Sequence, residues 1–72
     1  MRLHSVTLHG GAAGIGRRIR ELALEDTGAE VTTLRRSGQS LAFDAETTLL
    51  AGDVLVLRGG AEAVGQAEGR LL

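Results

Sequence analysis

The chain has 72 residues, a formal net charge of −1, no cysteine and a single aromatic residue, Phe43. A chain this short forms one small domain at most, and without cysteine it has neither disulfides nor thiolate metal sites. Its near-neutral charge and lack of Trp and Tyr offer no electrostatic footprint or stacking platform for a nucleic acid, and no apolar run is long enough for direct membrane insertion.

The first half of the chain predicts a strand, a helix and a second strand. Residues 3–9 alternate in polarity, which predicts a strand. Four glycines within residues 10–16 interrupt it. Apolar residues then recur at helical spacing over residues 15–25, which predicts an amphipathic helix of about two to three turns. We expect Gly28 to end this helix in a left-handed cap.

The second half predicts two or three further strands. Residues 29–36 are rich in β-branched side chains and predict a strand that closes in a turn at residues 37–38. Residues 41–43 have the composition of a short third strand. The turn at residues 52–53 precedes a strand over residues 54–57, whose unbroken apolar run predicts burial on both faces.

Residues 61–72 predict a C-terminal helix. Its apolar side carries Val64, Ala67 and Leu71. Gly65 and Gly69 inside the helix should each cost about 1 kcal/mol relative to alanine. We therefore expect packing, rather than intrinsic propensity, to hold this helix.

The glycine-rich segment offers one enzymatic alternative. Gly10, Gly14 and Gly16 between a strand and a helix resemble the start of a short-chain dehydrogenase, where glycines let a helix N-terminus approach a pyrophosphate. However, the chain has neither the catalytic Tyr nor the Lys of that class, and the second strand ends in Arg35 and Arg36 instead of the acidic residue that binds an NAD ribose. A fragment of a dinucleotide-binding enzyme remains the alternative to a non-enzymatic module.

Other polar residues do not form a convincing catalytic or metal site. His4 and His9 lie five residues apart on a strand and therefore point to opposite faces. Asp44, Glu46 and Asp53 all lie in turns, and we expect Asp53 to fix its own backbone turn. We predict that the chain is not an enzyme and that it uses no metal or obligatory cofactor.

The order of these features resembles a known family. The motifs that carry the resemblance are Val6-Thr7-Leu8, Gly14-Ile15-Gly16-Arg17, Glu21-Leu22-Ala23-Leu24, Thr27-Gly28-Ala29-Glu30-Val31, Leu34-Arg35-Arg36, Thr48 to Gly59, Ala67-Glu68 and Leu71-Leu72. Together they resemble the TrkA-C domain, the C-terminal subdomain of the cytosolic RCK (regulator of potassium conductance) modules, over about residues 3–72. Two prolines common in the family are missing, and the nucleotide-binding N-terminal half of an RCK module has no counterpart here.

The resemblance implies a fold and a function. It implies one TrkA-C-like regulatory domain over residues 1–72, of the α+β class, with a small two-layer arrangement of about four strands and two helices. The thin aliphatic core and the resemblance both predict a homodimer. The resemblance further implies a cytoplasmic, ligand-sensing part of an inner-membrane potassium transport protein, of the Kef-type cation:proton antiporter or the Trk/Ktr type. In some relatives the groove between two such subunits binds cyclic di-AMP, which makes a regulatory nucleotide the expected ligand.

An anionic ligand would have to be recognised by arginine, since the chain has no lysine. The expected ligand-binding residues are Gly14, Ile15, Gly16, Arg17, Arg18, Arg35 and Arg36. We expect Arg17 and Arg18 to lie in the first turn of a helix, where backbone N–H groups and the helix dipole favour an anion. Arg35 and Arg36 point to opposite faces of a strand, so only one can face a shared groove. The simpler alternative is that Arg17 and Arg18 form a solvated surface paired with Glu21 or Glu25.

Overall fold

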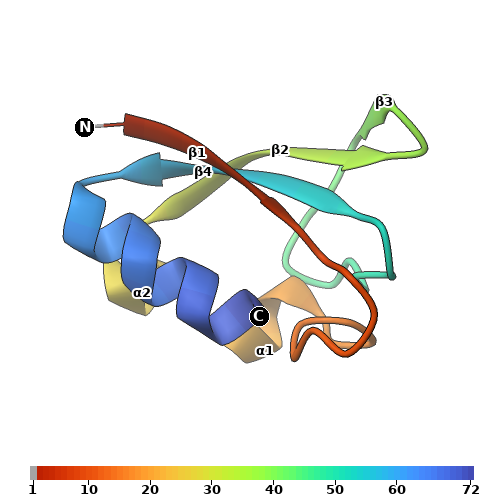
Figure 1. The fold of residues 1–72 in the computed structure, drawn as a ribbon, viewed down its shortest axis with the longest axis horizontal. Coiled ribbons are helices and arrows are strands. Elements are labelled where there is room, and N and C mark those ends of the chain that lie inside the picture. Colours follow the sequence, from red (N-terminus) through yellow and green to blue (C-terminus); the bar gives the residue numbers. More distant parts are fainter. Residues whose placement is uncertain (1) are drawn as a thin grey trace.

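A four-stranded sheet forms one layer of the molecule, and the helices pack against one of its faces (Figure 1). The computed structural model describes residues 2–72. In chain order the elements are β1 (Arg2–Thr7), α1 (Ile19–Leu22), the 3-10 helix η1 (Leu24–Thr27), β2 (Glu30–Arg36), β3 (Gln39–Leu41), β4 (Val54–Gly59) and α2 (Ala61–Leu71). The strand order is β1-β4-β2-β3, and every neighbouring pair is antiparallel. The predicted α+β class is confirmed.

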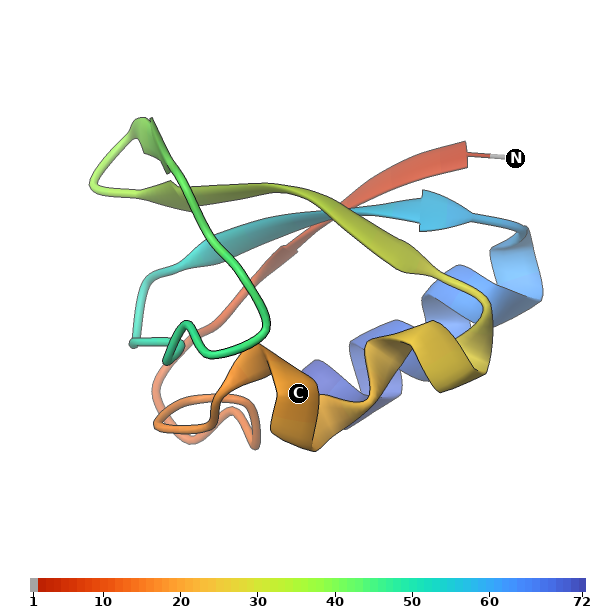
Figure 2. The ribbon, with the colours of Figure 1, turned by 180° about the vertical axis from the view of Figure 1, so that it is seen from behind.

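β4 lies between β1 and β2 in the sheet, and this central position accounts for only part of its apolar sequence. Leu55 and Leu57 are completely buried on the face that the helices cover. Val54 and Val56 lie on the opposite face and remain half-buried. The prediction that this strand is buried on both faces was therefore wrong, because the helices cover one face and leave the other open (Figure 2).

α2 closes the core. Val64, Ala67 and Leu71 are buried against the sheet, as predicted from their spacing. Gly65 and Gly69 lie on the exposed side, and a methyl group at either position would meet no atom within 4 Å outside the helix's own backbone. No helix within residues 2–72 combines the length and apolar character needed to cross a membrane.

The helix predicted over residues 15–25 does not form as one piece, and that prediction was wrong. α1 has only 4 residues, and Ala23, with φ 47°, separates it from η1. Gly16 adopts φ +83°, which lies outside the right-handed helical region. Residues 10–16 lie mostly in turns. The N–H groups of Ala13, Gly14 and Gly16 donate to Leu72, Leu71 and Leu49, far along the chain, and those of Ile15 and Arg17 donate only three residues back, as in a turn.

The turns around β2 follow the local sequence more closely. Gly28 has φ 88° and occupies the predicted left-handed cap before β2. Ser37 (φ 55°) and Gly38 (φ 78°) form the tight turn of a hairpin. A two-residue turn starts the return strand at once, so β3 begins at Gln39 and not at residue 41 as predicted.

Candidate functional site

Two segments far apart in sequence meet at the site. Residues 16–20 run beside residues 45–49, the connection that leads from β3 to β4 (Figure 2). Four backbone hydrogen bonds join them: Gly16 N to Leu49 O (2.8 Å), Leu49 N to Arg17 O (2.9 Å), Ile19 N to Thr47 O (3.0 Å) and Arg20 N to Ala45 O (2.9 Å). Arg18 and Thr48 form an isolated antiparallel bridge within this pairing. The backbone that carries Arg17, Arg18 and Arg20 is therefore fixed by long-range contacts.

The backbone of the glycine-rich segment is already hydrogen-bonded. Gly14 N donates to Leu71 O (2.9 Å), Gly16 N to Leu49 O, and Arg18 N to Glu21 Oε1 (2.8 Å). α1 begins at Ile19, so Arg17 and Arg18 precede the helix. The expectation that they occupy the first turn of a helix was therefore wrong, and the N–H groups expected to assist anion binding have internal acceptors.

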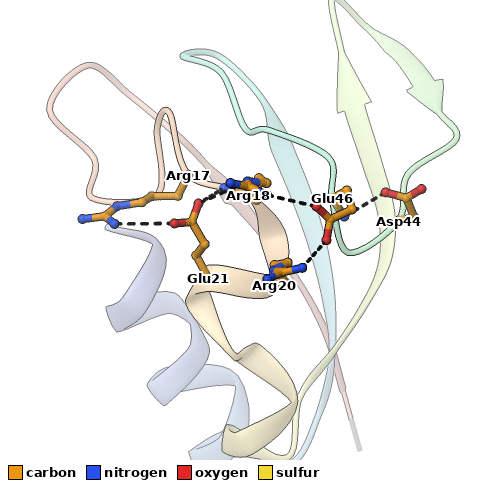
Figure 3. Close-up of polar contacts among 6 residues, drawn as sticks. All are labelled: Arg17, Arg18, Arg20, Glu21, Asp44 and Glu46. Carbon is orange, nitrogen blue, oxygen red and sulfur yellow. Dashed lines mark hydrogen bonds and ion pairs between the residues drawn. The ribbon is translucent and has the colours of Figure 1, made fainter.

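The side chains nearby form a surface network, shown in Figure 3. We call Arg17, Arg18 and Arg20, with Glu21 and Glu46, the arginine cluster. The three arginine side chains are 62%, 50% and 61% exposed. Its contacts are Arg18 Nη1 to Glu46 Oε1 (3.1 Å), Arg20 Nη1 to Glu46 Oε2 (2.8 Å), Arg17 Nη1 to Glu21 Oε2 (3.9 Å) and Arg18 Nε to Glu21 Oε1 (3.9 Å). The pairing of Arg17 and Arg18 with Glu21, expected if they form a solvated surface, is present, whereas Glu25 has no such pair among the described contacts.

Glu46 is the carboxylate that makes the shortest contacts in the cluster. Hydrogen bonds from Arg20 and then Arg18 lower the pKa of the Glu46 carboxyl, and the same contact raises the pKa of Arg20. Glu46 is therefore ionised at neutral pH. Because all partners are exposed, these ion pairs contribute little to stability and remain open to competition from other ions.

Arg36 has a different role from the arginine cluster. Its Nε donates to Asp53 Oδ1 (2.8 Å) and its Nη2 to Asp53 Oδ2 (2.7 Å) and Thr48 O (3.2 Å). The Asp53 side chain is completely buried. The Arg36 side chain, which covers it, is 32% exposed, so Asp53 lies just beneath the protein surface. Asp53 also accepts a hydrogen bond from Leu50 N (2.9 Å), which confirms that it fixes its own turn.

The hydrogen bond from Arg36 lowers the pKa of Asp53, even though burial alone would raise it. Through its two hydrogen bonds, the Arg36–Asp53 pair holds the start of β4 against the end of β2. A ligand that used Arg36 would have to compete with Asp53. Arg35 points to the other, open face of the sheet beside Ser40 and Val54, so it does not join the arginine cluster.

Two hollows border the arginine cluster. One, of about 420 Å³, is lined by Ala13, Arg17, Glu21, Leu22, Ala23 and Arg70. The other, of about 280 Å³, has apolar walls that include Ile19, Val31 and Phe43, and three acidic residues, Glu25, Glu30 and Asp44, also line it. Sequence reasoning missed Arg20, Glu46 and Phe43 as neighbours of this surface, because no spacing signal shows that residues 43–48 return to residues 17–20.

The histidines take no part in this surface. His4 Nε2 lies 3.1 Å from Glu68 Oε2, a contact that links β1 to α2. Within residues 2–72 no group of three or more metal-ligating side chains is arranged to hold a metal ion.

A four-stranded antiparallel sheet covered by helices on one face defines a small α+β domain. A family model of the TrkA-C domain matches residues 3–72, so the chain belongs to the TrkA-C family, a family of regulatory domains. A comparison with curated proteins gave no match.

Solved structures share the fold. The RCK_C domain dimer of S. agalactiae BusR in complex with c-di-AMP superposes with a TM-score of 0.80 at 15% identity, covering 97% of this chain and 95% of that one. A structure of an RCK domain with cda superposes with a TM-score of 0.76 at 20% identity and covers 100% of both chains. At these identities the likeness establishes the RCK_C fold.

Proposed function

We propose that residues 1–72 are a regulatory domain that forms a homodimer, binds an anionic nucleotide and transmits the binding to a potassium transport protein. The family match over residues 3–72 carries this proposal. The two structural relatives support the ligand class, since one is described as a dimer in complex with c-di-AMP and the other as a complex with cda. A two-fold dimer suits a two-fold ligand, because each subunit presents the same contacts to half of it.

The arginine cluster is where we propose that the phosphates bind, with Arg17 and Arg18 from the segment Gly14-Ile15-Gly16-Arg17-Arg18. Arginine pairs well with phosphate because its planar guanidinium donates two parallel hydrogen bonds. The hollow beside it, with Ile19 and Phe43 in its walls, offers a flat base an apolar contact. The carboxylates of Glu25, Glu30 and Asp44 at the same hollow can accept hydrogen bonds from the base but would repel a phosphate. We therefore place the phosphates at the arginines and the base in the hollow, away from each other's charges.

The transport partner is proposed from the family, whose name links it to potassium uptake. We propose a Kef-type cation:proton antiporter or a Trk/Ktr-type system as the membrane protein that this domain regulates from the cytoplasm. The dinucleotide-binding alternative is not supported by the fold, because a Rossmann-type site needs a mainly parallel sheet and all strand pairs here are antiparallel.

Two measurements test the proposal. Sedimentation equilibrium at tens of micromolar should give twice the chain mass of 7.5 kDa, and a folded monomer over that range would contradict the dimer. A thermal-shift screen with cyclic di-AMP, other nucleotides and sulfate should then identify a ligand whose affinity falls in Arg17→Ala or Arg18→Ala. Arg35→Ala removes the same charge from the opposite face; if it alone weakens binding, the ligand lies on the open face of the sheet.

A further inference from the structure

Glu46 places a carboxylate between two arginines in the way that a phosphate would be placed. One of its oxygens accepts from Arg18 and the other from Arg20, at 3.1 Å and 2.8 Å, as Figure 3 shows. A phosphate group binds a pair of arginines in the same way, with two oxygens of one anionic centre each held by a separate guanidinium. The geometry of the site is thus already matched to such an anion.

The backbone that carries the two arginines is held in place without Glu46. Arg20 N donates to Ala45 O, and Ile19 N, between the two arginines, donates to Thr47 O. Arg18 N donates to the Glu21 side chain. Because these contacts involve the backbone, loss of the Glu46 carboxylate would leave both arginines on the same fixed segment, with their guanidinium groups free to reach another anion.

Glu46 itself is weakly tied. Its side chain is 54% exposed, and within residues 2–72 its carboxylate contacts only Arg18 and Arg20. Its backbone is anchored separately, since Glu46 N donates to Asp44 Oδ1 (2.9 Å). The carboxylate can therefore swing into solvent while the chain on which it sits stays in place.

We propose that Glu46 is a built-in occupant of the Arg18–Arg20 pair and that a phosphate or phosphodiester group of the ligand displaces it on binding. This inference rests on the proposed function in one respect: it takes the ligand to be an anionic nucleotide. The carboxylate acts as an internal competitor: the site accepts ligand only in the fraction of molecules where Glu46 has left, which weakens the apparent affinity. Glu46 thereby sets the ligand concentration at which the domain responds.

The test compares Glu46→Gln with the wild type by titration calorimetry with cyclic di-AMP at low ionic strength. Removing the competing charge should tighten binding by about 1.5- to 5-fold, the range that coupling between exposed ion pairs provides. Glu62→Gln, in the first turn of α2, makes the same change in net charge and should leave binding near the wild-type value. In the Arg20→Ala background, Glu46→Gln should give a smaller gain, because half of the pair is missing.

The outcomes separate this inference from the proposed function. If cyclic di-AMP binds the wild type but Glu46→Gln binds no more tightly than Glu62→Gln, the displacement is refuted and the proposed function stands. If cyclic di-AMP binds neither protein, that ligand is wrong, and thermal shift with inorganic pyrophosphate decides the inference. A larger pyrophosphate shift for Glu46→Gln than for the wild type and Glu62→Gln would support it, and equal shifts would overturn it.

Discussion

Replacing the two exposed glycines of α2 should stabilise the domain substantially. At Gly65 and Gly69 an added methyl group meets nothing within 4 Å outside the helix's own backbone. A Gly→Ala change in a helix interior is worth about 1 kcal/mol; Gly65 is interior, whereas Gly69 lies in the last turn of α2 and should contribute less, so the double change should give about 1–2 kcal/mol. For a domain of this size about 1 kcal/mol corresponds to about 4–8 °C in Tm, so the double variant should melt about 4–16 °C above the wild type.

The assay is thermal and urea denaturation followed by circular dichroism at one fixed protein concentration, because dimerisation makes stability depend on concentration. Gly59→Ala, at the end of β4, is the contrasting control at a crowded position, since its methyl group would lie 3.3 Å from the Cα of Ala29. That variant should be less stable than the wild type. A double variant at Gly65 and Gly69 that melts at or below the wild-type temperature would contradict the placement of these two glycines on an open, solvent-facing side of α2.

Three further predictions concern the core, pH and cofactors. Gly14→Ala should lower the free energy of unfolding by about 1–3 kcal/mol in urea melts, because its methyl group would lie 3.2 Å from the backbone oxygen of Leu71. Gly10→Ala, which has open space around it, is the control in the same melts. Hydrogen bonding from Arg36 lowers the pKa of Asp53. The stabilisation from the ionised Asp53 is therefore complete above its unfolded-state pKa of about 4 and is lost as pH falls through the lower folded-state pKa. In urea melts, the free energy of unfolding of Asp53→Asn should fall less steeply below about pH 4 than that of the wild type, and an equal pH dependence would contradict this. NAD and NADP should show no binding by titration calorimetry, and affinity on the order of micromolar would revive the enzyme alternative.

Local sequence patterns predicted the elements whose contacts are local. The spacing of Val64, Ala67 and Leu71 defined the buried side of α2, and Gly28 and Gly38 marked the turns on either side of β2. These features depend on helical periodicity and on backbone angles that favour glycine. The family resemblance supplied the two layers and the number of strands and helices, whereas the strand order was not predicted.

Long-range contacts could not be predicted in the same way. The apolar spacing over residues 15–25 suggested a helix, but pairing with residues 45–49 holds Gly16 and Arg17 in a non-helical conformation. Glu46 and Asp53 were treated as turn residues, although each binds arginines distant in sequence. No spacing rule connects such pairs, because the connection passes through the folded sheet.

The stoichiometry of cyclic di-AMP binding tests the central claim most directly. Titration calorimetry on the wild-type chain, with sedimentation equilibrium on the same sample, should give one ligand for every two chains and a mass of twice 7.5 kDa. That ratio follows from a two-fold ligand shared across a two-fold axis. One ligand per chain on a monomer, or no binding of any nucleotide in the screen, would contradict a dimeric ligand-sensing domain.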